Sequence, residues 1–184
     1  MDEEIDFIID STKENMQGAI AHLEKQLANI RAGKATPAML GSVRVDYYGS
    51  STPLNQVANV NTPDARTITI QPFEKSQMQN IEKGIMFANL GFNPMNNGDV
   101  IIISVPPLTE ERRRELSKQA KGEAEDAKIG VRNDRKVANQ DIKKLDISDD
   151  MKKIAEDEIQ KLTDTYISRI DEIFAKKEKE IMTV

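Results

Sequence analysis

The sequence predicts an α+β protein, in which a long antiparallel three-helix bundle carries a small inserted β/α/β domain. Two observations support this prediction. All seven prolines lie between residues 37 and 107, and the flanking segments contain almost no helix-breaking residues. Residues 32–104 hold only ten charged side chains, whereas the flanks hold the other forty-seven. We therefore expect residues 1–31 and 106–184 to form the bundle and residues 32–105 to form the inserted domain.

The N-terminal segment predicts one long amphipathic helix. Apolar residues recur every seven positions, and further core candidates fill the neighbouring rows, as in helices that pack along one face. The seven-residue series is Ile9, Met16, Leu23 and Ile30, and the neighbouring rows add Ile5, Thr12, Ile20 and Leu27.

The middle of the chain predicts short strands and a single helix. The stretches SVRVDYYG, RTITIQPF and DVIIISV alternate apolar and polar residues or form a short buried run, which is typical of strands. Between the second and third of them, residues 74–88 place apolar side chains at helical spacing, namely Met78, Ile81, Ile85 and Met86.

The C-terminal flank predicts two more long helices. Thr109 is placed to cap the first, and Ser148, followed by two acids, is placed to cap the second. The first helix carries Leu116, Ala120, Ala124, Ala127, Val131, Ala138, Ile142 and Leu145, and the second carries Met151, Ala155, Ile159, Leu162, Tyr166, Ile170, Ile173 and Ile181. None of the three helices can bury its apolar stripe alone, so a three-helix bundle is the simplest arrangement.

Composition and motifs argue against several classes of function. The chain has no cysteine, a net charge of −5 and an acidic N-terminus, MDEEIDFIID, which is the opposite of a targeting signal. Its longest apolar run, residues 100–103, is far too short to span a membrane. His22 is the only histidine, and the chain has no Walker A, GxSxG or GxGxxG motif. We expect a cytoplasmic, non-enzymatic protein without cofactor, metal site or membrane partner.

The stretch KGEAEDAKIGVRNDRKVANQD, residues 121–141, is unusually basic for this acidic chain. On a helix, Lys121, Lys128, Arg132, Arg135 and Asn139 lie about 40–100° to one side of the line through Val131. Four acids lie on the other side: Glu123, Asp126, Asp134 and Asp141. A stripe of cations suits a phosphate backbone. Together with Arg31 and Lys34 at the end of the first helix, these four cations form the predicted RNA-binding set.

Two other functions stay open at this point. A helical adaptor or chaperone would use the basic stripe only as a solvated face with ion pairs, and its interactions would depend little on salt. An enzyme without a recognisable motif would require a ligand-sized pocket with convergent polar groups. The charged cluster ERRREL, residues 111–116, is interpreted as mostly structural because its arginines can pair with neighbouring acids.

Several motifs resemble, in order and over nearly the whole chain, those of bacterial ribosome recycling factors. They are RAGKATPAML, VDYYGSSTPLNQVANV, LGFNPMNNGD, VPPLTEERRREL, KGEAEDAKIGVRNDRKVAN and KLTDTYISRIDEIFAKKEKEIM. The resemblance implies a monomeric, L-shaped protein with the outline of tRNA. It also implies binding to ribosomal RNA across the A and P sites of the large subunit. With GTP-bound elongation factor G, such a protein separates the subunits and releases mRNA and tRNA.

The resemblance also assigns individual residues. The family's RNA-contacting arginines correspond to Arg31, Arg132 and Arg135. Its hinge corresponds to residues 31–35 and 104–108, which include Ala32, Gly33, Ala35, Val105, Pro106 and Pro107. Lys34 and Lys136 stand where arginine is common in the family, which keeps the charge and loses the bidentate fork. The connector DIKKLDISDD is a few residues shorter than in familiar members, so both flanking helices are expected to end a turn early.

Overall fold

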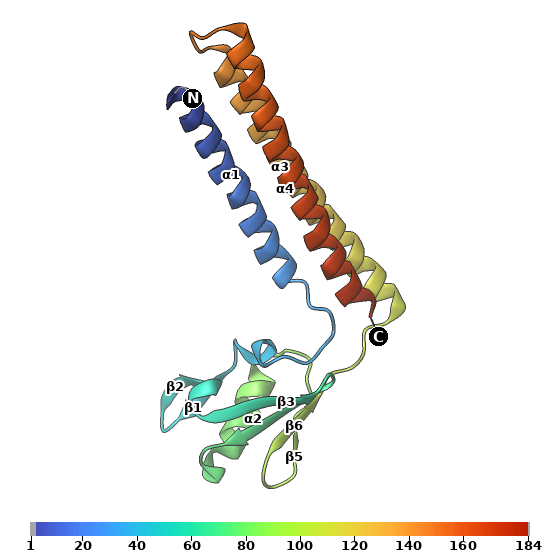
Figure 1. Cartoon of the computed structure of the whole chain (residues 1–184). Coiled ribbons are helices and arrows are strands. Elements are labelled where there is room, and N and C mark those ends of the chain that lie inside the picture. Colours follow the sequence, from blue (N-terminus) through green and yellow to red (C-terminus); the bar gives the residue numbers. More distant parts are fainter. Residues whose placement is uncertain (1–2, 184) are drawn as a thin grey trace. The chain divides into compact units, whose positions relative to one another are not determined.

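The computed structural model describes residues 3–183, which form two compact units. The helical unit takes in the described residues up to Ala32 and those from Thr109 onward, and the small unit is Gly33–Leu108. Each unit has its own core, and each is described separately below (Figure 1).

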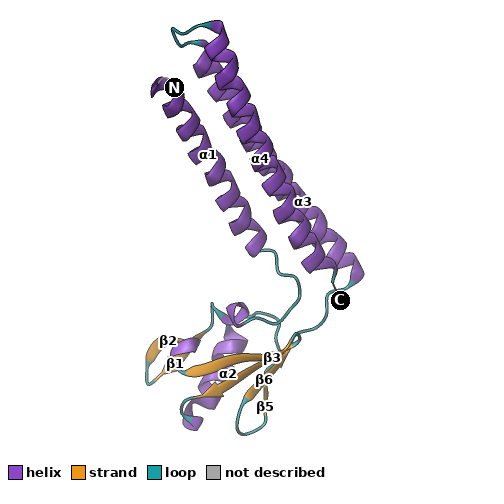
Figure 2. Cartoon of the chain, in the orientation of Figure 1, coloured by secondary structure: helices purple, strands orange, loops and turns teal. Residues whose placement is uncertain are grey.

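The helical unit is built from α1 (Glu3–Ala28), α3 (Glu110–Lys143) and α4 (Asp149–Met182). Ile5 at the start of α1 packs with Ala138 and Ile142 near the end of α3, and with Ala155 and Ile159 near the start of α4. The helix α1 is therefore antiparallel to α3 and parallel to α4 (Figure 2). The predicted bundle of long helices is confirmed in the described part of the chain.

Both predicted helix caps are confirmed. The Thr109 Oγ1 accepts a hydrogen bond from the Arg112 backbone N at 3.1 Å, and the Ser148 Oγ accepts one from the Met151 N at 3.3 Å. Each bond satisfies one backbone donor that the first helical turn leaves unpaired. The short loop between these helices keeps α3 and α4 side by side.

The core of the helical unit follows the predicted periodicity. Met16, Leu23, Val131, Ile159 and Ile170 are each at most 1% exposed. Of the apolar residues predicted for the three long helices, only Met151 is exposed, because it lies in the first turn of α4. Two threonines lie within this apolar core, and their hydroxyls are satisfied by donating to a carbonyl one turn earlier in the same helix. The Thr12 hydroxyl donates to the Ile8 O at 2.7 Å, and the Thr163 hydroxyl donates to the Ile159 O at 2.8 Å.

Asp134 on α3 is half-buried, and burial raises the pKa of its carboxyl above the ordinary value of 3.8. No ion pair reaches it from the residues that the structure describes. The charged form is therefore penalised above the raised pKa, and the penalty disappears as the pH falls through that pKa. We expect Asp134→Asn to raise the Tm by about 1–3 °C at pH 7 and by nothing below pH 3.8. Thermal melts across this pH range test it, and Asp141→Asn, an exposed acid of the same helix, is the control.

The small unit combines two antiparallel sheets with one α-helix in its described residues. A hairpin is made of β1 (Arg44–Tyr47) and β2 (Ser50–Pro53), and the larger sheet has the order β3-β4-β6-β5. Its strands are β3 (Ala58–Asp64), β4 (Thr67–Pro72), β5 (Met95–Asn96) and β6 (Ile101–Ser104), and the helix is α2 (Met78–Phe87). Val45, Ile68, Ile70, Ile81 and Ile103 are fully buried in the shared core.

Two details of the small unit differ from the prediction. The segment predicted as a helix from residue 74 begins instead as a 3-10 turn, Lys75–Gln77, and becomes α-helical only at Met78. Met86, one of the four apolar residues at helical spacing, is 67% exposed and does not belong to the buried face of α2. The buried face of this short helix is completed by Met78, Ile81 and Ile85 alone.

Two residues of the predicted hinge are fastened to the small unit. The Ala35 N donates to the Ala65 O at 2.8 Å, and the Val105 N donates to the Arg66 O at 2.7 Å. Both side chains are buried in the core of the small unit, at 8% and 6% exposure. The incoming and outgoing chain segments are thus held at neighbouring residues of the β3–β4 turn.

Gly33 has a positive φ of 77° and lies against Leu108. A Cβ added at Gly33 would come within 2.6 Å of the Leu108 Cγ, so alanine there combines an unfavourable backbone conformation with a clash. We expect Gly33→Ala to lower the free energy of unfolding by about 2–4 kcal/mol, measured by thermal and denaturant unfolding of the full chain.

Gly91 offers a matched control, because its φ is 78° and a Cβ there would meet nothing within 4 Å. Gly91→Ala should therefore lower the free energy of unfolding by only about 1 kcal/mol, because it adds an unfavourable backbone conformation without a clash. Leu108→Ala introduced into Gly33→Ala should recover part of the difference. Equal losses at Gly33 and Gly91 would show that the contact with Leu108 has no effect on stability.

Candidate functional site

An open hollow between α3 and α4 contains Arg132, Arg135 and Asn139 of the predicted basic face. Its volume is about 620 Å³. Four of its lining side chains are cations, four are amides, and neither Asp nor Glu is among the lining residues: Arg132, Asn133, Arg135, Lys136, Asn139, Gln140, Lys143 and Gln160. Such a surface offers hydrogen-bond donors and positive charge without a competing carboxylate.

The two helices fix the geometry of the hollow from both sides. The Arg135 Nη1 donates to the Gln160 Oε1 of α4 at 3.2 Å, and the Gln160 Nε2 donates to the Asp164 Oδ1 at 2.9 Å. Asp164 accepts a hydrogen bond from the amide nitrogen of Gln160, and this bond orients the amide oxygen of Gln160 toward Arg135. The guanidinium is therefore positioned across the α3–α4 groove, and its remaining N–H groups stay available for a ligand.

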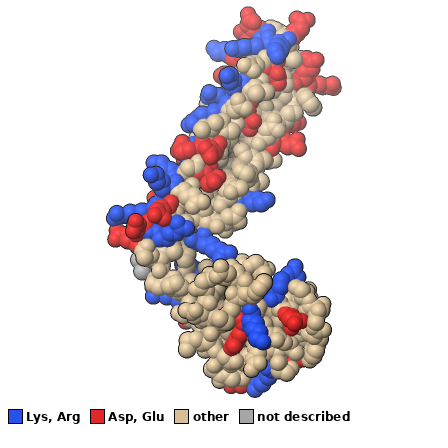
Figure 3. All heavy atoms as spheres, turned by 180° about the vertical axis from the view of Figure 1, so that it is seen from behind, with Lys and Arg blue, Asp and Glu red and all other residues tan. Residues whose placement is uncertain are grey.

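The other cations of the hollow are unpaired. Arg132, Lys136 and Lys143 are exposed and form no ion pair with any residue in the described range 3–183. Figure 3 shows Lys and Arg side chains along the upper part of one long edge of the helical unit, with Asp and Glu among them lower down and along the other edge. Lys136 and Lys143 were not in the predicted RNA-binding set, because they lie about 140° and 120° from the Val131 line, outside the 40–100° band.

Lys128 differs from the rest of the predicted set. Its side chain is only 17% exposed, and its Nζ lies 2.6 Å from the Asp171 Oδ1 of α4 and 3.8 Å from the Glu125 Oε1. Its charge is therefore used to hold α3 on α4, and we leave it out of the group available to a ligand. Sequence reasoning missed this because Asp171 is distant in the chain.

The remaining predicted cations lie outside the hollow. Lys121 is exposed, about 17 Å along α3 from Arg132. Arg31 follows the C-terminal end of α1, and because α1 is antiparallel to α3, it lies toward the opposite end of the helical unit from Arg132. Lys34 belongs to the small unit.

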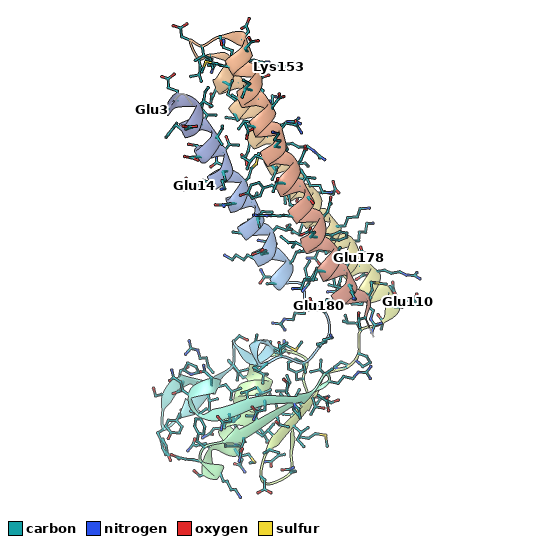
Figure 4. All side chains as sticks on the ribbon, in the orientation of Figure 1. Glu3, Glu14, Glu110, Lys153, Glu178 and Glu180 are labelled. Atoms are coloured by element: carbon teal, nitrogen blue, oxygen red, sulfur yellow. The ribbon has the colours of Figure 1, made fainter. Side chains whose placement is uncertain are left out.

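The arginines of ERRREL at the start of α3 are mostly paired, as predicted. Arg112 contacts Glu115 at 2.9 Å, and Arg114 contacts Glu110 at 2.7 Å. Glu110 lies at the same end of the helical unit as Glu178 and Glu180 of α4, whereas Glu3 and Lys153 lie at the other end (Figure 4). This end of the bundle therefore presents mixed charge, unlike the hollow.

A second polar cluster closes the β1–β2 hairpin of the small unit. The Tyr47 and Tyr48 hydroxyls donate to the two oxygens of Glu74, at 2.8 and 2.7 Å. These bonds lower the pKa of the Glu74 carboxyl, chiefly through Tyr48, and the bond to Glu74 raises the pKa of Tyr47. The Tyr48 side chain is 71% exposed. The cluster fixes the turn and has no nucleophile or base poised for chemistry.

Other kinds of site lack support in residues 3–183. No group of three or more His, Cys, Asp or Glu side chains there could hold a metal ion. No helix in the same range has the length and apolar character needed to cross a membrane.

Comparison with known proteins gives consistent matches. The family model described as ribosome recycling factor matches residues 23–182. The ribosome-recycling factor of Flavobacterium psychrophilum is 80% identical over 132 residues, covering 72% of this chain and 71% of the relative. That of Flavobacterium johnsoniae is 75% identical over 132 residues, with the same coverage.

Two solved structures resemble the fold. A solution structure of the ribosome recycling factor covers 100% of both chains, with 38% identity and a TM-score of 0.74. The other is described as "Models for the T. thermophilus ribosome recycling factor and the E. coli elongation factor G bound to the E. coli post-termination complex". It has 42% identity and a TM-score of 0.60, and it covers 97% of this chain and 99% of its own.

Proposed function

Because the chain belongs to the ribosome recycling factor family, a family of translation factors and not of enzymes, we propose that it binds the post-termination ribosome across the A and P sites of the large subunit. Acting as a monomer in the cytoplasm with elongation factor G and GTP, it separates the subunits and releases mRNA and tRNA. Family membership is the observation that carries this proposal. The neighbour described together with elongation factor G on a post-termination complex supports the choice of partners.

The RNA-contacting surface in this proposal is the hollow between α3 and α4. Arg132 and Arg135 bind phosphate oxygens through their guanidinium forks, and Lys136 and Lys143 add positive charge on the same wall. The absence of carboxylates from the lining supports this choice, because an acid there would repel phosphate. Lys121, Arg31 and Lys34 make further contacts outside the hollow.

Elongation factor G supplies the force in this proposal, so the chain itself needs no nucleotide site. The proposed hinge contains fewer residues than the sequence suggested. Ala32, Gly33, Pro106 and Pro107 form the segments that bend, because Ala35 and Val105 are hydrogen-bonded into the small unit.

Breakdown of polysomes tests the function directly. Post-termination polysomes are mixed with the protein, a matched elongation factor G and GTP, and the products are separated by sedimentation. We expect monosomes and subunits only when all components are present. No breakdown by the folded protein would contradict the proposal, and absence of any ribosome association would favour the adaptor hypothesis.

A further inference from the structure

Asn139 brings an unsatisfied amide to the hollow. Its side chain is among those lining the hollow, and its Oδ1 is buried without a hydrogen-bond partner in the described residues. A buried acceptor without a donor destabilises the free protein. Because the oxygen itself is buried, a ligand donor in the hollow could satisfy it only after a half-turn about the Cβ–Cγ bond, which exchanges the positions of the amide oxygen and nitrogen.

Phosphate groups cannot play this role. An ionised phosphate has acceptor oxygens only, so the cations of the hollow suit it and the Asn139 oxygen does not. The ligand group that faces Asn139 must carry an N–H or O–H. In RNA, the ribose 2′-hydroxyl is such a donor, and it lies within one nucleotide of the phosphates that the neighbouring cations would hold.

We infer that Asn139 accepts a hydrogen bond from a ribose 2′-hydroxyl while Arg132, Arg135 and Lys136 hold the adjacent phosphates. The inference rests on the proposed function, and it adds a residue that distinguishes RNA from a phosphate backbone without that hydroxyl. The hydroxyl is favoured over a base amino group because every RNA nucleotide carries a 2′-hydroxyl next to its phosphate, whereas in the minor groove only guanine presents an amino group. A-form RNA displays its 2′-hydroxyls in a wide, shallow minor groove, which an open hollow between two helices can approach without unpairing bases.

Two duplexes of one sequence test the inference, an RNA duplex and its fully 2′-O-methylated counterpart. Methylation keeps the A-form helix, the phosphates and the 2′-oxygen, but it removes the 2′ donor. We expect the full-length protein at low salt to bind the RNA duplex about 5–10-fold more tightly than the methylated one, in line with one net hydrogen bond. Asn139→Ala should bind both duplexes alike.

Two variants serve as controls. Gln119→Ala changes an exposed amide of the same helix outside the hollow, and it should keep the wild-type preference. Lys136→Ala should weaken binding to both duplexes equally and reduce the salt slope by about 1, because it removes a phosphate contact. Thermal melts confirm that each variant is folded.

The remaining outcomes would overturn the inference. Equal binding of both duplexes by the wild type would mean that no 2′ donor is read, and equal weakening of both by Asn139→Ala would point to a base amino group. If Asn139→Ala still bound the RNA duplex more tightly than the methylated duplex, another group of the protein would recognise the 2′-hydroxyl. No duplex binding, with binding to large ribosomal subunits intact, would exclude recognition of the sugar by the hollow. Loss of binding to large ribosomal subunits as well would remove the proposed function itself.

Discussion

Val131→Asp is expected to unfold the helical unit. Val131 is fully buried at the centre of the apolar stripe of α3, where a carboxylate would have no cation partner and no water. The free energy of unfolding should fall by about 4–5 kcal/mol or more, which is most of the stability of an ordinary domain. Far-UV circular dichroism should show a large loss of helix at 25 °C, or a Tm lowered by more than 10 °C.

Ile129→Asp is the matched control for this substitution. Ile129 lies on the same helix two residues earlier, but its side chain is 62% exposed. The added charge should therefore stay in water and change the free energy of unfolding by less than about 1 kcal/mol. Similar melting curves for the two variants would contradict the placement of Val131 in the core.

The double variant Arg132→Ala/Arg135→Ala is expected to lose most of its ribosome binding. Charge-assisted hydrogen bonds contribute about 1.5–3 kcal/mol each, so two arginines together correspond to about 10²–10⁴-fold in affinity. Co-sedimentation with large subunits at two salt concentrations measures the affinity and its salt slope, which should fall by about 0.7–0.9 for each lost phosphate contact. Polysome breakdown should fall with it.

The fold of this variant should be almost unaffected. Arg132 is exposed, and Arg135 loses only its bond to Gln160, so the Tm should change by no more than about 3 °C. Arg112→Ala/Arg114→Ala removes two arginines of the same helix that are paired with Glu115 and Glu110, and it should bind like the wild type. Binding to large subunits with wild-type affinity would show that the hollow is not the RNA contact. A Tm lowered by much more than about 3 °C would mean that the two arginines stabilise the fold, and the assignment of the hollow as the RNA contact would lose its main support.

Features that depend on local sequence could be predicted in advance. The caps at Thr109 and Ser148 and the alternation of Ile68 and Ile70 follow from interactions within a few residues, and they are confirmed. The helical periodicity around Val131 also holds, because burial repeats with the geometry of a single helix.

Features that depend on distant partners could not be predicted. Pairing of Lys128 with Asp171 requires the register of α3 against α4, which no local pattern defines. The same register brings Gln160 to Arg135 and adds Lys136 and Lys143 to the hollow. The exposure of Met86 could not be predicted, because α2 is too short for periodicity to distinguish its buried face from its edge. The RNA-binding role and the hinge stay predictions for the experiments above.

The attachment of Ala35 and Val105 to neighbouring residues of one turn has a consequence for the order of folding. The helix α1 is separated from α3 and α4 by the whole stretch 29–109, and closing so long a loop is slow and entropically costly. Once the small unit has formed, residues 35 and 105 are held at adjacent positions, and the effective loop shrinks to the two short connectors. The logarithmic dependence on loop length makes this saving about 1–2 kcal/mol. Folding of the small unit before the bundle would therefore lower the entropic cost of docking α1 onto the α3–α4 hairpin.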